Sequence, residues 1–578
     1  MNRFVKFLPF VGLLVLYIAA LFIDVMDVDS SQYAAMAMEM VEKGNFLEIT
    51  DQGRNYLDKP PLLFWLSALS YSVFGISNVA FKLPSMLFAL LGILSVYRFS
   101  KLYYSEKVAY WAALMLGSTQ AYFLMVNDVR TDLMLTGSVA FAVWQLAAYI
   151  ENKKVVNFIL GFVGIGLAML AKGPIGMVLP VAAFGIHILL LRDWKTIFKW
   201  QWLVGLLIVG VVLLPMCIGL YTQYDSNPNV EVNGEVGVSG LKFYFWTQSF
   251  GRITGENVWS NNPGAFFLTE STLWAFLPWT VLMFSAWIAG WFKIIKSKFR
   301  IEKGQEAITL GAFTFALLAL SKSSYQLPHY IFVAYPFAAV FTARWAICIL
   351  EEGLPWTKNL VKGVQVFITV LIWVATLAVL FYVFSPKNMV LPIVVVIGII
   401  AILSYLIKNI RKTTAVLQAA FISICLFNLV MNTHFYPQLL QYQAFDVGGR
   451  FMAKKAKEEN ITRDRFIVFP FGSAHSLDFY TGWLVRSIWS EEYFSHFKNG
   501  DEIWVYTNKK GRARLEELPY KITEELYMPY YKPAELRIEF INPATRDSTL
   551  RHHYILKLEI QNQDSIEFSK FVPQLEYE

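Results

Sequence analysis

A carboxylate at the start of an amphipathic segment is the first feature that could do chemistry. Asp29 precedes residues with helical periodicity, and Tyr33 falls on their apolar side, which is typical of a helix along a membrane surface. A carboxylate at a helix start could accept a proton from a hydroxyl group. The alternative is that Asp29 and Gln32 form a capping pair.

A second candidate site lies thirty residues further on, where Asp58 and Lys59 precede two prolines. A residue before proline is extended, and proline favours the first turn of a helix, so we expect a helix from Leu62 to Phe74. A cation beside the free N–H groups of a helix start can bind a phosphate. The alternative is an interfacial lysine whose ammonium group reaches water.

Single cations also occupy short connections between apolar stretches, namely Arg130, Lys172 and Lys322. A cation at membrane level is costly without a partner, so we expect these three to face anions. Asp128 and Asp132 bracket Arg130; a helix cap is the alternative for Asp132, and the role of Asp128 stays open. His329 and Tyr330 begin another apolar stretch, where a lone histidine is more often a hydrogen-bonding residue than a catalyst.

Composition places these residues in a membrane protein. The chain has 578 residues, of which 56% are hydrophobic and 16% charged, below the ~25% charged residues of soluble domains. The net charge of +7 is spread over many short loops, which excludes a nucleic-acid-binding surface, and three cysteines in apolar stretches form no disulfide or metal pattern. About thirteen apolar stretches approach the length that a bilayer requires: 8–23, 80–99, 108–126, 133–150, 155–170, 175–191, 202–221, 265–292, 307–320, 330–350, 361–384, 389–407 and 415–431.

Loop charges predict the orientation. Clusters of lysine and arginine occur in alternate connections, and the positive-inside rule assigns them to the cytoplasm together with the N-terminus. The first loop (24–61), the second long loop (222–264) and the region 434–578 are then extracytoplasmic.

The region 434–578 differs in composition from the apolar stretches before it. Charge becomes frequent, and short alternating stretches predict strands at 465–469, 502–506, 536–540 and 554–558, with a helix over 446–459. We expect a small soluble α/β domain after a transmembrane domain of residues 1–433. His475, His552 and His553 lack metal-ligand spacing and are expected at its surface.

Several motifs together resemble the GT-C membrane glycosyltransferases, especially the bacterial aminoarabinose transferase and protein mannosyltransferase branch. The resemblance covers about the first 440 residues, and the first loop is its specific part. The motifs are the aspartate and tyrosine at 29 and 33, Asp-Lys-Pro-Pro-Leu at 58–62, Arg-Thr-Asp at 130–132, Lys-Gly-Pro at 172–174 and Leu-Pro-His-Tyr at 327–330.

The resemblance implies roles for these residues. Asp29 and Asp132 would be catalytic, with Asp29 as the base. Arg252 matches the family's phosphate-contacting arginine, and it would hold a lipid phosphate with Lys59, helped by Lys172 or Lys322. The remaining residues expected to bind substrate are Tyr33, Asp58, Arg130, His329 and Tyr330.

One departure concerns metal. Where aminoarabinose transferases tend to carry Glu-His, with the histidine as a metal ligand, this chain has Gln248 and Ser249. A divalent ion is therefore doubtful, and no metal ligand is assigned, since Asp58 by itself makes no site.

The expected function is that of an inverting glycosyltransferase in the bacterial inner membrane. Its donor would be a sugar on a polyprenyl phosphate, because nucleotide sugars are absent outside the cytoplasm. The acceptor stays open between an envelope glycolipid of the lipid A type, a protein and a glycan. The alternatives are a polysaccharide polymerase or ligase, which differs in its acceptor, and a non-enzymatic transporter of lipid phosphate or polysaccharide. A transporter would show charges near mid-membrane and paired halves.

Overall fold

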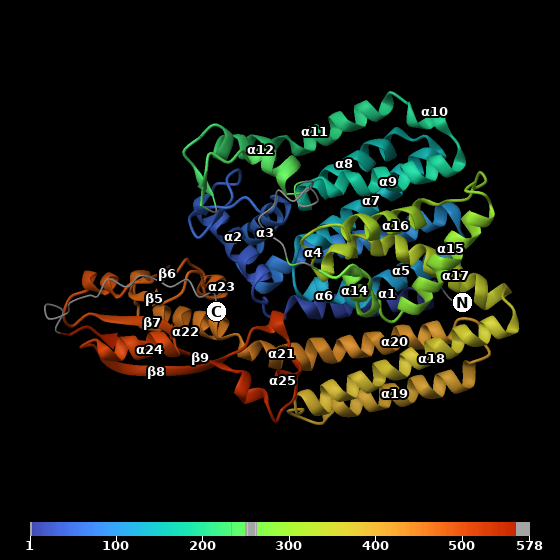
Figure 1. Cartoon of the computed structure of the whole chain (residues 1–578). Helices are drawn as coiled ribbons and strands as arrows, with labels where there is room; N and C mark the ends of the chain where they lie inside the picture. The colour runs from blue at the N-terminus through green and yellow to red at the C-terminus, as the bar shows by residue number, and fades with distance from the viewer. Residues whose placement is uncertain (1–2, 233, 249–250, 252–260, 262, 562–578) are drawn as a thin grey trace.

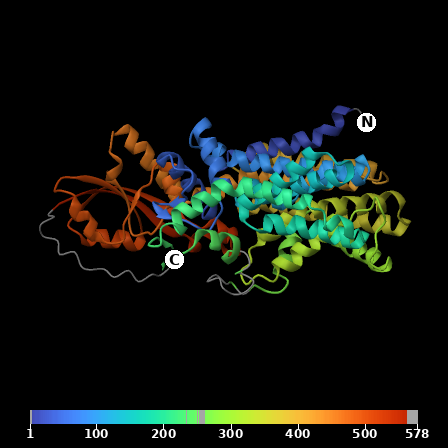
Figure 2. The ribbon, with the colours of Figure 1, turned by 90° about the horizontal axis from the view of Figure 1, so that it is seen from above.

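The computed structural model describes residues 3–232, 234–248, 251, 261 and 263–561. A long bundle of helices and a C-terminal region with a sheet lie end to end, and the N-terminus is at the far end of the bundle (Figures 1 and 2). The helices up to the C-terminal region are α1 (Arg3–Leu21), α2 (Asp29–Lys43), α3 (Leu62–Phe74), α4 (Asn78–Tyr103), α5 (Glu106–Gly117), α6 (Gln120–Asn127), α7 (Thr131–Asn152), α8 (Val155–Lys172), α9 (Ile175–Leu191), α10 (Trp194–Ile197), α11 (Gln201–Leu220), α12 (Gly240–Lys242), α14 (Phe267–Ala275), α15 (Thr280–Lys296), α16 (Ile308–Leu320), α17 (Tyr335–Glu352), α18 (Pro355–Ala378), α19 (Val390–Asn409) and α20 (Ala415–Val430).

The protein is a multi-pass membrane protein. Within the described residues, eight helical segments are long and apolar enough to cross a bilayer: Asn78–Tyr103, Thr131–Asn152, Val155–Lys172, Trp194–Asp225, Pro328–Glu352, Pro355–Val383, Val390–Asn409 and Ala415–Tyr442. The other expected stretches are shorter helices or are broken. The stretch 108–126 divides into α5 and α6, and the stretch 265–292 into α14 and α15.

The first loop contains both expected helices. Helix α2 begins at Asp29 and α3 runs from Leu62 to Phe74, as the sequence predicts. Helix α2 does not lie open along a membrane surface, because it packs against α3 and against a helix of the C-terminal region. Two short strands, β1 (Thr50–Asp51) and β2 (Arg54–Asn55), form a hairpin between them.

The C-terminal region contains a mixed sheet, as expected of an α/β domain. Its strand order is β6-β5-β7-β9-β8, with parallel pairs β5–β6 and β5–β7 and antiparallel pairs β7–β9 and β8–β9. Alternate residues of β7 pack on opposite faces, so both faces of the sheet are covered by apolar side chains. The elements are α21 (Tyr436–Leu439), α22 (Ala444–Glu458), β5 (Phe466–Val468), α23 (His475–Thr481), β6 (Arg486–Ser487), β7 (Glu502–Asn508), α24 (Lys509–Glu517), β8 (Lys521–Tyr530), α25 (Ile538–Ile541) and β9 (Arg551–Glu559).

Three of the four expected strands are confirmed as β5, β7 and β9, while the strand expected at 536–540 is wrong because this segment forms the short helix α25. Two of the three histidines are also not at the surface. His553 is buried among aromatic rings, and His475 hydrogen-bonds Asp51 of the first loop. The helical segment that begins at Ala415 continues to Tyr442, so the division at 433–434 stays a prediction.

Candidate functional site

Arg130 joins the first loop to the connection between α6 and α7. Its Nη1 contacts the Asp29 carboxylate at the start of α2, and its Nε lies 2.9 Å from Asp128 Oδ2. The side chains of Arg130 and Asp128 are 20% and 15% exposed. Burial lowers the pKa of Arg130, but Asp128 and Asp29 raise it more, so the pKa lies above its usual range and the guanidinium stays charged. Arg130 therefore fixes where the Asp29 carboxylate lies.

A second ion pair lies one residue beyond the start of α7. Asp132 Oδ1 contacts Lys172, the last residue of α8, and Asp132 Oδ2 lies 3.7 Å from His329 Nε2. The Lys172 ammonium group also lies 4.2 Å from the centre of the Tyr330 ring, a cation–π distance. The structure thus brings together four predicted residues from three separate connections.

Tyr33 is influenced by the charges of both groups. Its ring is buried in α2 and packs edge-on against Phe64 of α3, with 5.7 Å between centroids. Burial raises the pKa of the Tyr33 hydroxyl well above its usual value, and the nearby charges of Asp29 and Asp132 raise it further, while Arg130 opposes them. Tyr33 therefore stays a neutral hydrogen-bonding group close to both carboxylates.

Lys59 reaches the same neighbourhood from the first loop. The charges of Lys59, Arg130 and Lys172 all act on the ring of His329. Lys59 also lines a small, mostly apolar cavity with residues of the first loop, α3, α11 and the helical turn after α12, which include Leu57, Pro60, Pro61, Trp65, Met216, Leu220 and Tyr244. Lys59 thus places one cation beside an apolar lining next to the start of α3.

Other predicted residues are not joined to this group. Lys322 is exposed in the turn after α16 and contacts no residue of the group in the described part of the chain. The negative charge of Asp58 raises the pKa of the Tyr33 and Tyr56 hydroxyl groups. Arg252 and Ser249 lie outside the described residues.

The part of the chain that the structure describes offers few ligands for a metal ion. There, no three side chains of His, Cys, Asp and Glu gather as metal ligands. Asp132 and His329 lie near each other, but Lys172 contacts the other oxygen of the Asp132 carboxylate. These residues do not fit a divalent ion, and no catalytic step is assigned to one.

Sequence reasoning missed Lys82. It lies inside the apolar stretch 80–99, and its buried ammonium group donates hydrogen bonds to the carbonyl oxygens of Ala20, Asp24 and Asn127 at 3.4, 3.4 and 2.8 Å. A lysine inside an apolar stretch was the available signal, since such a charge needs partners.

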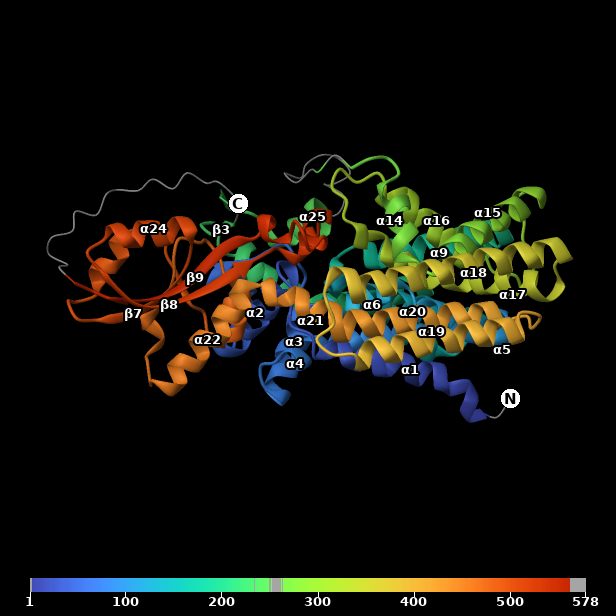
Figure 3. The same cartoon turned by 90° about the horizontal axis from the view of Figure 1, so that it is seen from below.

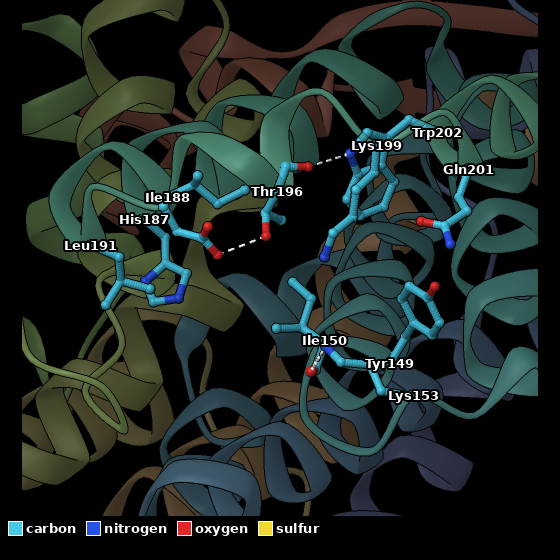
Figure 4. Close-up of a pocket in the computed structure, with 11 residues that line it drawn as sticks. Tyr149, Ile150, Lys153, His187, Ile188, Leu191, Thr196, Lys199, Gln201 and Trp202 are labelled. Carbon is cyan, nitrogen blue, oxygen red and sulfur yellow. Dashed lines mark hydrogen bonds between the residues drawn. The ribbon is translucent and has the colours of Figure 1, made fainter.

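A different cavity, of about 250 Å³, lies away from this group, against the segments 149–153, 187–193 and 196–202 (Figure 4). Lys153 and Lys199 line it with Trp202 and Gln201. These lysines belong to the basic connections expected in the cytoplasm, and none of the predicted site residues reaches the cavity.

Comparisons with known proteins bear on the family and the fold. A family model described as dolichyl-phosphate-mannose-protein mannosyltransferase matches residues 58–218. The crystal structure of ArnT from Cupriavidus metallidurans bound to undecaprenyl phosphate superposes with a TM-score of 0.72 at 16% identity, over 98% of this chain and 100% of that one. The chain has the fold of ArnT. The structure of the same ArnT in the apo state superposes on this chain with a TM-score of 0.69.

Curated relatives match over a shorter stretch. The undecaprenyl phosphate-alpha-4-amino-4-deoxy-L-arabinose arabinosyl transferase of Shewanella sediminis is 26% identical over 59% of this chain and 58% of its own length. A similarly named transferase of Proteus mirabilis is 22% identical over 55% of each chain. The chain thus spans little more than half the length of these relatives. With the family model and the ArnT fold, they confirm the resemblance to the GT-C aminoarabinose transferase and mannosyltransferase group.

Proposed function

We propose that the protein is an inverting glycosyltransferase that moves a sugar from a polyprenyl phosphate to an acceptor on the outer face of the bacterial inner membrane. The observation that carries the proposal is the placing of Asp29 at the start of α2, held by Arg130, in the same neighbourhood as Lys59, Lys172 and His329. The ArnT fold, seen with undecaprenyl phosphate, supports the lipid donor.

The Asp29 carboxylate would take the proton of the acceptor hydroxyl group as its oxygen bonds to the anomeric carbon of the sugar. The bond from that carbon to the phosphate oxygen breaks, and the electron pair leaves with the polyprenyl phosphate. Attack from the face opposite the phosphate inverts the anomeric carbon. Asp29 is 39% exposed, so its carboxylate is accessible to an acceptor.

Cations would stabilise the charge that develops on the departing phosphate. Lys59 is the principal candidate because it lines a small apolar cavity beside the start of α3. Arg252 is proposed as its partner from the family motif. Lys172 is held by Asp132 and stacks on Tyr330, so we propose that Asp132 positions Lys172 rather than reacting itself.

The distribution of charge favours an enzyme over a transporter. Asp132 follows the start of α7, Lys172 ends α8 and His329 follows the start of the segment Pro328–Glu352. These groups therefore lie at span ends, whereas transporters place such groups near mid-membrane at discontinuous helices. The acceptor, a glycolipid of the lipid A type, a protein or a glycan, depends on residues that no motif names.

The test is Asp29→Asn. Asparagine keeps the size of the side chain and still accepts a hydrogen bond from Arg130, so folding and binding of undecaprenyl phosphate should change little. Loss of a positioned base should lower the transfer rate ~100- to 10,000-fold. Cells are compared whose only copy of the gene encodes either the parent protein or the variant. Mass spectrometry of their envelope glycolipids and glycoproteins detects the transfer whichever sugar is moved.

Asp464→Asn is the matched control, because Asp464 is a 69% exposed aspartate of the C-terminal region. Its cells should show the parental envelope. If Asp29→Asn cells also carry the parental amount of every glycolipid and glycoprotein, Asp29 is not the base and the proposal fails.

A further inference from the structure

The residues that precede Asp29 are held by the C-terminal region, more than 400 positions away in the sequence. The Val25 N–H donates to the Tyr480 hydroxyl at 2.8 Å, and the Asp27 N–H donates to Gln443 Oε1 at 2.8 Å. The Gln443 amide group donates in turn to the Val25 carbonyl at 3.1 Å and to Asp446 Oδ2 at 2.6 Å. One side chain thus joins two backbone groups of the first loop to a carboxyl group of α22.

This contact is buried. Gln443 is 0% exposed and Asp446 is 2% exposed, and α23 packs along α2 in the same interface. Figures 1 and 3 both show α2 at the junction between the C-terminal sheet and the helical bundle. Helix α2 has no side-chain cap, since Val28 stands at its N-cap position. The C-terminal region therefore supplies hydrogen bonds for a segment whose backbone groups would otherwise need water.

We propose that Gln443, Asp446 and Tyr480 are positioning residues, which hold the start of α2 so that Asp29 faces the acceptor. The proposal rests on the role proposed for Asp29. Asp29 is two residues from Asp27, so a shift of the 25–28 segment moves its carboxylate directly. A misplacement of about 1 Å can cost ~100-fold in rate.

The contact also contains two buried carboxyl groups, those of Asp27 and Asp446, and the charge of Asp27 acts on Asp446. Asp446 Oδ1 has no hydrogen-bond partner among the described residues, although it is buried. Burial raises the pKa of Asp446 well above its usual value, and the charge of Asp27 raises it further; burial also raises the pKa of Asp27. The other groups that interact with this pair are Asp24, Ser31, Gln443, Arg450, His475, Ser476, Tyr480, Tyr506, Tyr530 and Lys532.

Asp446 is buried with one carboxyl oxygen unpartnered, and its raised pKa means that it holds its proton to a higher pH than an ordinary aspartate does. Neutral Asp446 accepts the Gln443 hydrogen bond without a second negative charge beside Asp27. Loss of this proton at high pH would place two charges in the contact and push the first loop away from α22. The positioning of Asp29 should therefore weaken as pH rises.

The first experiment compares Gln443→Ala with Gln441→Ala in purified full-length protein. Gln441 is an exposed glutamine two residues away. We expect Gln443→Ala to bind undecaprenyl phosphate as the parent does, which also verifies its fold, and to transfer sugar ~10- to 100-fold more slowly. Gln441→Ala should match the parent in both. A Gln443→Ala variant with the parental turnover rate overturns the proposal.

The second experiment repeats Gln443→Ala in the Asp29→Asn background. If Gln443 acts through Asp29, the double variant should be no slower than Asp29→Asn itself. Independent, multiplicative losses would show that Gln443 acts elsewhere and overturn the positioning role. This outcome is distinct from failure of the base assignment, in which Asp29→Asn transfers sugar at the parental rate.

The third experiment tests the proton. Asp446→Asn imitates the neutral acid, so it should restore the turnover that Asp446→Ala loses and should lack the alkaline fall in turnover that the parent shows. The undecaprenyl phosphate affinity of all three proteins should agree. An alkaline fall of the same size in Asp446→Asn and in the parent would overturn the assignment of this proton to Asp446.

Discussion

Asp478 offers a quantitative test of how the first loop and the C-terminal region hold together. Its carboxyl group is fully buried in α23, where Oδ1 accepts a hydrogen bond from the Val485 N–H at 2.8 Å and Oδ2 accepts one from Gln52 of the first loop at 2.7 Å. Burial raises the pKa of Asp478 to about 7, against the opposing effect of these two hydrogen bonds. An aspartate in an unfolded chain has a pKa of about 3.9.

The sign of the effect follows from this difference. Below pH ~4, Asp478 is protonated in both states and does not affect the stability of the fold. As pH rises to ~7, the unfolded chain ionises while the folded chain keeps its proton, so stability falls. A difference of roughly 3 pKa units corresponds to a loss of ~4 kcal/mol, complete above pH ~7.

Asp478→Asn should remove this loss. Asparagine can accept from Val485 and, with the Gln52 amide reversed, donate to Gln52, and it does not ionise. The free energy of unfolding, measured with denaturant in detergent between pH 4 and 8, should favour the variant increasingly as pH rises, by up to ~4 kcal/mol. Asp464→Asn, at an exposed site, should follow the parental curve. Parallel curves for parent and Asp478→Asn would refute the reasoning, because the other buried carboxyls titrate equally in both proteins.

Two further predictions concern metal and topology. Chelators should reduce sugar transfer by the purified protein only modestly, because Lys59 and Arg252 can meet the phosphate without an ion; complete loss that added metal restores would reveal ligands outside the described residues. A reporter fused after Met431 should be extracytoplasmic and one fused at Gly304 cytoplasmic, because basic clusters alternate with sparsely charged loops. Both reporters on one side would overturn the orientation.

Local patterns predicted the elements that carry the site. The start of α2 at Asp29 and of α3 at Leu62 follow from helical periodicity and from the proline pair, which act within one or two turns. Strand β8 was not predicted, because its burial does not alternate regularly over Lys521–Tyr530 as it pairs with β9 at the sheet edge. The stretch 536–540 alternates like a strand, yet it forms a helical turn. In this turn the ring of Phe540 stacks on the ring of Tyr531, with 3.8 Å between the ring centroids.

The partner of each charge could not be predicted in the same way. The sequence predicts that Arg130 and Lys172 face anions, and both do, but the anions are the carboxylates of Asp29, Asp128 and Asp132. Arg130 and Asp29 are 101 positions apart, so no spacing rule relates them. The contact between Gln443 and Asp27 spans 416 positions and depends on how the C-terminal region packs on α2.

Lys82 links segments of the chain that are far apart in the sequence and lie next to the site. Its ammonium group is buried and meets the carbonyl oxygen of Ala20 near the end of α1 and that of Asn127 at the end of α6. A lysine amino group has several N–H donors, so Lys82 can hydrogen-bond the ends of both helices at once. Asp29 follows the end of α1 by eight residues, and Arg130 follows the end of α6 by three. Lys82 therefore ties together the two segments, one after α1 and one after α6, that carry Asp29 and Arg130.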